Sequence, residues 1–221
     1  MEKKHSKKKK HKDGAKNGLI PTSSRLSCVL RHFAGGSAYD IFVIHRLSHS
    51  EVFSSIWNVV DAVNKYPKLA FYYLESHDKQ REIARSFRLK SKPGFACCGG
   101  AIDVLLFWVE CPSEIEYEKA NCGSIKFFCG RKHKFGLNLQ GTCDSDGKFL
   151  DVCIGHPAST SDYLSFSTST FKTKLESTVF LADGLCIFGD NAYVDCLYMA
   201  TPFKNVPSGT KDDYNHYHSQ L

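Results

Sequence analysis

The chain has 221 residues, enough for one sizeable hydrophobic core or for a medium domain joined to a small one. Its formal net charge of +6 comes from the first 16 residues, with eight lysines and two acids, because the rest balances 21 basic against 21 acidic residues. No run approaches the roughly 18 apolar residues of a membrane span, and no apolar signal segment follows the lysines. We therefore expect no membrane partner and no secretion.

Residues 1–16 form a lysine-rich block without apolar periodicity, which predicts a disordered tail. Such a block can direct nuclear import or attract phosphates loosely, or it can be a solvated tail with no specific role. Both interpretations stay open. The expected localisation is the nucleus, or the nucleus and the cytoplasm.

Ten cysteines raise the alternatives of disulfides, zinc ligands and small buried side chains. The absence of a signal peptide argues against disulfides. Zinc sites need close ligand pairs such as C-x-x-C, whereas Cys97 and Cys98 are adjacent and the other cysteines are widely spaced. The spacing therefore favours small buried hydrophobic side chains over a zinc site.

Residues 17–92 are predicted to form a helical region. A first helix with apolar residues at helical spacing ends at Gly35-Gly36, and a second begins at a capping box of Ser48 and Glu51 and ends before Pro67. The short segment 37–47 joins them. This pair resembles a helix-turn-helix unit, or it is an ordinary helical pair that caps a neighbouring domain.

A further helical piece covers residues 78–92 and is strongly basic. It includes Arg85 and Arg88, with four other Lys and Arg residues against two acids. This piece is a candidate DNA-facing surface, although a charged face of this kind is also typical of plain solvent exposure.

From Cys98 the hydrophobic period changes to that of strands. The run 101–109 follows two glycines and is apolar except for Asp103, which predicts a strand buried on both faces. After a polar loop at 112–123, alternation predicts strands at 134–140 and 150–154 with a turn at 144–147. One helix follows residues 159–161 and reaches Leu175, and a buried strand at 185–188 ends in Gly189-Asp190-Asn191.

The order β-β-β-α-β predicts a ribonuclease-H-like mixed α/β sheet over residues 93–221, preceded by the helical region. In that topology the first and fourth strands are neighbours, so Asp103 and Asp190 would meet. Two carboxylates in one place repel unless a proton or a cation is shared. A divalent metal would hold them, although a buried Asp can also act as a structural hydrogen-bond acceptor.

Several motifs resemble the PIF/Harbinger-type DDE transposases, a group described as DDE superfamily endonucleases. The matching stretches begin with CCGGAIDVLL, continue through FFCGRKHKFGLNLQGTCDSDGKFLDVCIGHPASTSDYLSF and GLCIFGDNAYVDCLYMATPF, and end with DDYNHYHSQL. The resemblance implies a ribonuclease-H-like nuclease domain in which two Asp and one Glu hold Mg²⁺ or Mn²⁺ for DNA strand cleavage.

Three acids carry over from the resemblance. Asp103 matches the Asp of the family's G-x-[IL]-D-G motif, Asp190 in GDNAY matches its second catalytic Asp, and Asp162 matches the acid of P-G-S-x-x-D, so all three are candidate metal ligands. Val104 and Ala158 replace motif glycines. The family's third acid, a Glu beyond the last motif, has no counterpart within the 221 residues, so the chain is expected to be truncated before it.

The resulting hypothesis is a transposase-derived, metal-dependent DNA endonuclease that hydrolyses or cleaves phosphodiesters and is impaired by the truncation. DNA contacts would come from Arg131, Lys132 and Lys134 together with Arg85 and Arg88, and a second protein subunit would be a further partner for DNA binding. The main alternative is a non-catalytic DNA- or protein-binding remnant. A cysteine-rich zinc protein is a third.

Overall fold

The computed structural model describes residues 19–71, 73–119 and 121–220, so the predictions for the tail at 1–16 lie outside the described residues. The chain forms two compact units, Met1–Ala70 and Phe71–Leu221. The sequence had placed the boundary after residue 92. Instead, helix α4 (His77–Lys90) belongs to the second unit because it packs against that unit's central strand.

The first unit contains the helices α1 (Thr22–Phe33), α2 (Ala38–His45) and α3 (His49–Asn64), followed by a short 3-10 turn, η1 (Pro67–Leu69). The prediction that residues 37–47 merely connect two helices was wrong, because most of them form α2. The apolar core of this unit is formed by buried side chains from all three helices: Cys28, Val29, Ile41, Val52 and Ile56. The helix-turn-helix interpretation stays a prediction.

Local polar contacts fix the ends of these helices. The Ser48 hydroxyl accepts a hydrogen bond from the Glu51 backbone N–H at 3.3 Å, so the predicted N-cap of α3 is present. The Arg31 guanidinium donates to one Asp40 carboxylate oxygen at 2.9 and 2.7 Å, which ties α1 to α2.

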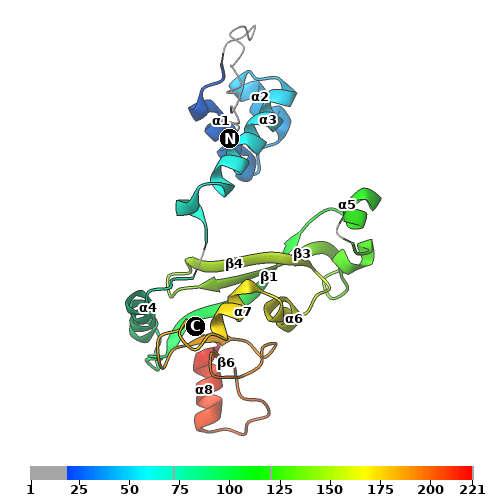
Figure 1. Cartoon of the computed structure of the whole chain (residues 1–221). Helices are drawn as coiled ribbons and strands as arrows, with labels where there is room; N and C mark the ends of the chain where they lie inside the picture. Colours follow the sequence, from blue (N-terminus) through cyan, green and yellow to red (C-terminus); the bar gives the residue numbers. More distant parts are fainter. Residues whose placement is uncertain (1–18, 72, 120, 221) are drawn as a thin grey trace, which may run out of the picture. The chain divides into compact units, whose positions relative to one another are not determined.

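The second unit is built on a mixed six-stranded sheet (Figure 1), as the ribonuclease-H-like prediction required. Its strands are β1 (Cys98–Trp108), β2 (Phe128–Cys129), β3 (Lys134–Cys143), β4 (Phe149–Pro157), β5 (Cys186–Gly189) and β6 (Met199–Ala200). Strand β3 lies antiparallel between β1 and β4, while β5 and β6 extend the sheet in parallel from β1. The first and fourth predicted strands are therefore neighbours.

The helices of this unit depart from the sequence prediction in three places. The single helix expected up to Leu175 is two, α6 (Asp162–Ser167) and α7 (Thr170–Leu175), because the Ser169 hydroxyl caps α7 by accepting from the Lys172 N–H at 3.1 Å. The loop at 112–123 contains α5 (Glu114–Lys119), followed by the 3-10 helix η2 (Ser124–Phe127). A C-terminal helix, α8 (Thr210–His218), was not predicted.

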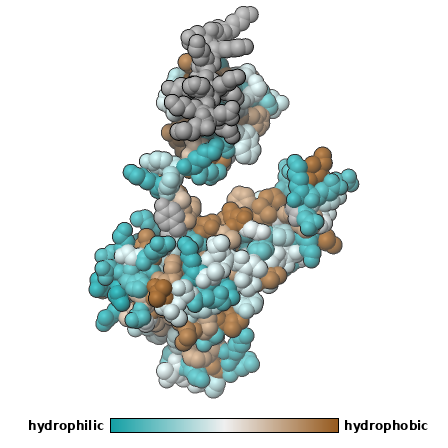
Figure 2. Space-filling model, in the orientation of Figure 1, coloured by the Kyte–Doolittle hydropathy of each residue, from teal (hydrophilic) through white to brown (hydrophobic). Residues whose placement is uncertain are grey.

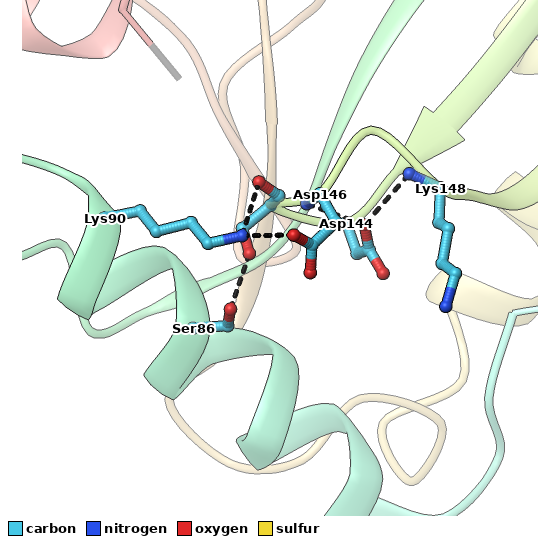
Figure 3. Close-up of polar contacts among 6 residues, drawn as sticks. Ser86, Lys90, Asp144, Asp146 and Lys148 are labelled. Carbon is cyan, nitrogen blue, oxygen red and sulfur yellow. Dashed lines mark hydrogen bonds and ion pairs between the residues drawn. The ribbon is translucent and has the colours of Figure 1, made fainter.

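Helix α4 is held in the second unit by contacts on its apolar side and on its polar side. Its apolar stripe, with Ile83 and Phe87, enters the core that also holds Cys98, Ile187 and Met199. On its polar side, Lys90 forms an ion pair with Asp146 and the Ser86 and Ser145 hydroxyls meet at 2.6 Å, which pins the helix to the β3–β4 turn (Figure 3). The other basic side chains of α4, Arg85 and Arg88 among them, face solvent.

Strand β1 is buried only in its first half, which corrects the expectation of a strand covered on both faces. Cys98 and Ile102 are buried, whereas Leu105 is 60% and Phe107 55% exposed. Brown, hydrophobic surface shows along the upper side of the second unit (Figure 2). Among the described residues, no helix is long and apolar enough to cross a membrane.

Candidate acidic site

The sheet brings Asp103 and Asp190 to neighbouring positions. Strands β1 and β5 are parallel, with Ile102 paired to Gly189, so the next residue on each chain segment is an Asp. Neighbouring strands lie only about 4.8 Å apart. The predicted adjacency of the two acids therefore follows from the register of two strands that are far apart in sequence.

Both carboxylates are exposed and held locally by backbone donors. One oxygen of Asp103 accepts from the Val104 N–H at 2.7 Å, and one oxygen of Asp190 accepts from the Ala192 N–H at 2.9 Å. Asp103 is thus not the buried carboxylate that its apolar neighbours in sequence suggested. Each acid keeps its position through one hydrogen bond and can direct its remaining oxygen to a ligand.

Asp162 opens helix α6 and is positioned by two buried amides of β3. The Gln140 side chain donates to the Asp162 carbonyl at 3.4 Å and to the Tyr193 hydroxyl at 3.0 Å, and Asn138 donates to the Thr160 carbonyl at 3.3 Å. The Ser161 hydroxyl caps the helix by accepting from the Leu164 N–H. This polar support explains why α6 begins at Asp162.

The pKa of Asp162 is raised, first by burial of the carboxyl and then by the negative charges of Asp190 and Asp103. The nearby Arg131 guanidinium and a hydrogen bond from Asn138 partly oppose this increase. The three acids therefore sense one another electrostatically. Asp190 contributes more to the increase than Asp103 does.

Asp103 and Asp162 nevertheless lie on opposite faces of the sheet. Side chains of paired antiparallel residues share a face of the sheet, and Asp103 pairs with Gly141. A Cβ at Gly141 would point toward the Phe149 ring, so Asp103 lies on the Phe149 face. The next pair along β1, Val104 and Gln140, points to the face on which α6 lies. An open groove on that face is lined by α6 and its neighbours, including Val104, Leu106, Arg131, Asp162 and Ala192.

The donor set at Asp103 and Asp190 suits a hard divalent cation. Mg²⁺ takes oxygen ligands and commonly uses only one or two carboxylates, and neither acid belongs to the ion pairs found among the described residues. In the described part of the chain, no group of three His, Cys, Asp or Glu side chains is arranged to hold a metal ion. Asp103 and Asp190 therefore offer the kind of oxygen ligands that such a cation takes, and the role of Asp162 as a ligand stays a prediction.

The predicted DNA-contacting residues fall into two separate clusters. Arg131, Lys132 and Lys134 lie at the beginning of β3, where the Lys134 ammonium sits 5.6 Å from the centre of the Trp108 ring. Arg85 and Arg88 lie on α4, which is fixed to the turn that follows the other end of β3. A ten-residue strand spans about 30 Å, so the two clusters do not form one patch.

Sequence reasoning missed His218 as a neighbour of the acids. Its ring stacks on Phe188, two residues before Asp190, with centroids 5.1 Å apart and planes 8° from parallel, and a ring nitrogen lies 3.2 Å from the Ala200 carbonyl. Burial lowers its pKa, while the Ala200 contact and the Asp190 charge act in the opposite direction. The only signal in sequence was its place in the DDYNHYHSQL motif.

A mixed sheet in 4-3-1-5-6 strand order, with one acid on β1 and the other directly after its parallel neighbour β5, is consistent with a ribonuclease-H-like fold. The model of the DDE superfamily endonuclease family matches residues 103–220, and the chain belongs to that family. Members of this family act on DNA and generally use divalent metals.

The chain is also similar to a curated relative, Protein ALP1-like of Arabidopsis thaliana. The two are 24% identical over 216 residues, which is 91% of this chain and 50% of the relative. The chain thus spans about half the length of the curated relative it matches. No solved structure gives a significant match.

Proposed function

We propose that this chain is a Harbinger-type, transposase-derived endonuclease domain that cuts DNA with the help of Mg²⁺ or Mn²⁺. The observation that carries the proposal is the adjacency of Asp103 and Asp190 on parallel neighbours β1 and β5, inside the region that matches the family. Nuclear localisation follows from a DNA substrate and remains part of the proposal.

Each polar residue would then have a distinct task. Asp103 and Asp190 would hold the cation, and their backbone hydrogen bonds would keep the carboxylates oriented. When bound, a divalent cation lowers the pKa of water and neutralises charge that develops on the phosphodiester. Arg131, in the groove beside Asp162, would bind a backbone phosphate through its planar guanidinium.

DNA binding would rest on contacts that do not depend on sequence. Arg131, Lys132 and Lys134 form one basic cluster, and the solvent face of α4 with Arg85 and Arg88 forms another. Lys and Arg contacts to phosphates supply affinity that falls steeply with salt. A duplex would have to extend along β3 to touch both clusters, which predicts a footprint longer than either cluster alone.

A specific observation favours the alternative of a non-catalytic DNA- or protein-binding remnant. Asp162 faces the groove on one side of the sheet while Asp103 faces the other side, so the three candidate ligands do not converge. Losing even an outer-shell partner of a metal ligand commonly costs 10–100-fold in metal affinity or activity, and losing a ligand should cost at least as much. We therefore expect the 221-residue polypeptide to be a slow nuclease.

Incubation of the full chain with supercoiled plasmid and Mn²⁺ distinguishes the two functions. The endonuclease proposal predicts slow nicking that Asp103→Asn reduces at least about tenfold, because one of two carboxylate ligands loses its charge. Asp183→Asn, at an exposed acid away from the site, is the matched control and should nick at the wild-type rate. DNA binding with no nicking at any Mn²⁺ concentration would favour the remnant, and nicking unaffected by Asp103→Asn would assign the activity to other residues.

A further inference from the structure

Two cysteines meet where the acid-bearing strands begin. Cys97 lies in the bend directly before β1, and Cys186 is the first residue of β5, 89 positions later. The Cys186 backbone N–H donates to the Cys97 carbonyl at 2.9 Å, and the Cys186 thiol approaches the same carbonyl at 3.8 Å.

The spacing of the two strands suits a covalent link between these residues. In the parallel register Cys186 pairs with Cys98, and its backbone hydrogen bond to the Cys97 carbonyl places Cys97 one residue before that pair. Neighbouring strands are about 4.8 Å apart, and disulfides span 4.4–6.8 Å between Cα atoms. Both thiols are free in the structure and only partly buried, so a small oxidant can reach them. A shared metal is not indicated, because the described residues hold no group of three such ligands, although Cys98 is adjacent.

The three neighbouring thiols differ in reactivity. The hydrogen bond to Cys97 and burial raise the pKa of Cys186, so Cys186 remains a thiol until Cys97 has been oxidised. The hydrogen bond from Cys186 lowers the pKa of Cys97 to about 6, which favours the nucleophilic thiolate at neutral pH. Burial raises the pKa of Cys98 to about 12, so that thiol stays protonated. Oxidation should therefore begin at Cys97 and not at its neighbour.

We propose that Cys97 and Cys186 form a reversible disulfide when the protein meets a peroxide. The Cys97 thiolate attacks one peroxide oxygen, the O–O bond breaks, and a sulfenic acid and one water form once the leaving oxygen is protonated. The Cys186 sulfur then attacks the Cys97 sulfur, the S–O bond breaks, and the thiol proton leaves with the second water. Two thiols are oxidised and one peroxide is reduced to two waters.

Such a bond would join the residue before β1, the strand that carries Asp103, to the first residue of β5, the strand that Asp190 follows. It would link β1 and β5 covalently four residues before Asp190, so oxidation would restrict their relative movement. Reduction by a dithiol would restore the free pair. The proposal concerns a modification site and does not depend on whether the acids bind metal.

The test treats the folded full chain with hydrogen peroxide, blocks remaining thiols with iodoacetamide, and maps disulfides by mass spectrometry of the digested protein. We expect free thiols, counted after denaturation, to fall from ten to eight and a cross-linked peptide pair containing Cys97 and Cys186 to appear, with both changes reversed by dithiothreitol. Cys97→Ser should abolish the pair. Cys111→Ser, at an exposed cysteine elsewhere, and Cys98→Ala should leave it intact.

Three outcomes would overturn the proposal. One is a native circular dichroism spectrum with no cross-link after peroxide. Another is a link that uses Cys98, either to Cys97 or to Cys186. The third is a cross-link that persists in Cys97→Ser, since it would require a different first nucleophile.

Discussion

The two halves of strand β1 differ in burial: the first half belongs to the hydrophobic core, and the second half is exposed and begins with the candidate ligand Asp103. From Cys98 to Ile102 the strand lies within the core, with α4 packed against it and Ile187 of β5 beside it. From Asp103 onward the same strand is open, and its apolar side chains Leu105 and Phe107 are more than half exposed. The acid therefore stands at the point where the buried framework ends and an accessible surface begins.

The largest loss of stability should come from a substitution in the core beside the buried half of β1. Ile187→Ala removes a fully buried side chain beside β1 and should lower the free energy of unfolding by about 2–5 kcal/mol. Leu105→Ala, on the open half, should cost about 0.5 kcal/mol or less because the side chain is mostly exposed. Urea denaturation of both variants measures the difference, and equal losses would mean that the open half is covered in solution.

A smaller effect should come from the close packing just before Asp190. A Cβ at Gly189 would lie 2.8 Å from the Tyr193 ring and 3.1 Å from Ile102 Cγ2, so Gly189→Ala should cost about 1–3 kcal/mol by overpacking. The matched control is Gly155→Ala on β4, where the new Cβ would meet only the Cys153 sulfur at 3.7 Å. Thermal unfolding that ranks the two variants equally would contradict the tight contact at Gly189.

The smallest effect concerns the pH dependence of stability at His218. Because the pKa of His218 is lowered in the folded state, unfolding takes up a proton. The neutral ring's contribution to the free energy of unfolding is therefore present above about pH 6.5 and is lost as the pH falls. His218→Phe keeps an aromatic ring against Phe188 but cannot titrate. Its stability should fall less than that of the wild type between pH 7.5 and 5.5, as measured by urea denaturation at each pH. An identical fall in both proteins would show that other groups control this range.

Sequence patterns predicted the strands of the sheet because apolar residues alternate with polar residues where one face of a strand is buried. Alternation located the antiparallel strands, and the order of elements placed β1 beside β5, which is enough to bring Asp103 and Asp190 together. The same patterns could not show that β1 is open beyond Ile102, because exposure depends on what the rest of the chain places over the strand.

The break between α6 and α7 and the position of Asp162 have related physical causes. The break before α7 depends on one cap at Ser169 within an otherwise continuous apolar stripe. The separation of Asp162 from Asp103 depends on the residue-by-residue register of β3, which decides the face to which each side chain points. A family motif names the acids but does not fix that register in this chain.

The central claim is that Asp103 and Asp190 jointly bind a divalent cation, and Mn²⁺ titration of the full chain tests it most directly. Free Mn²⁺ is followed by its electron paramagnetic resonance signal, which decreases on binding. We predict that Asp103→Asn and Asp190→Asn each weaken the strongest Mn²⁺ site by about 10–100-fold, while Asp183→Asn leaves it unchanged. Equal Mn²⁺ affinity in the wild type and in both site variants would contradict the assignment.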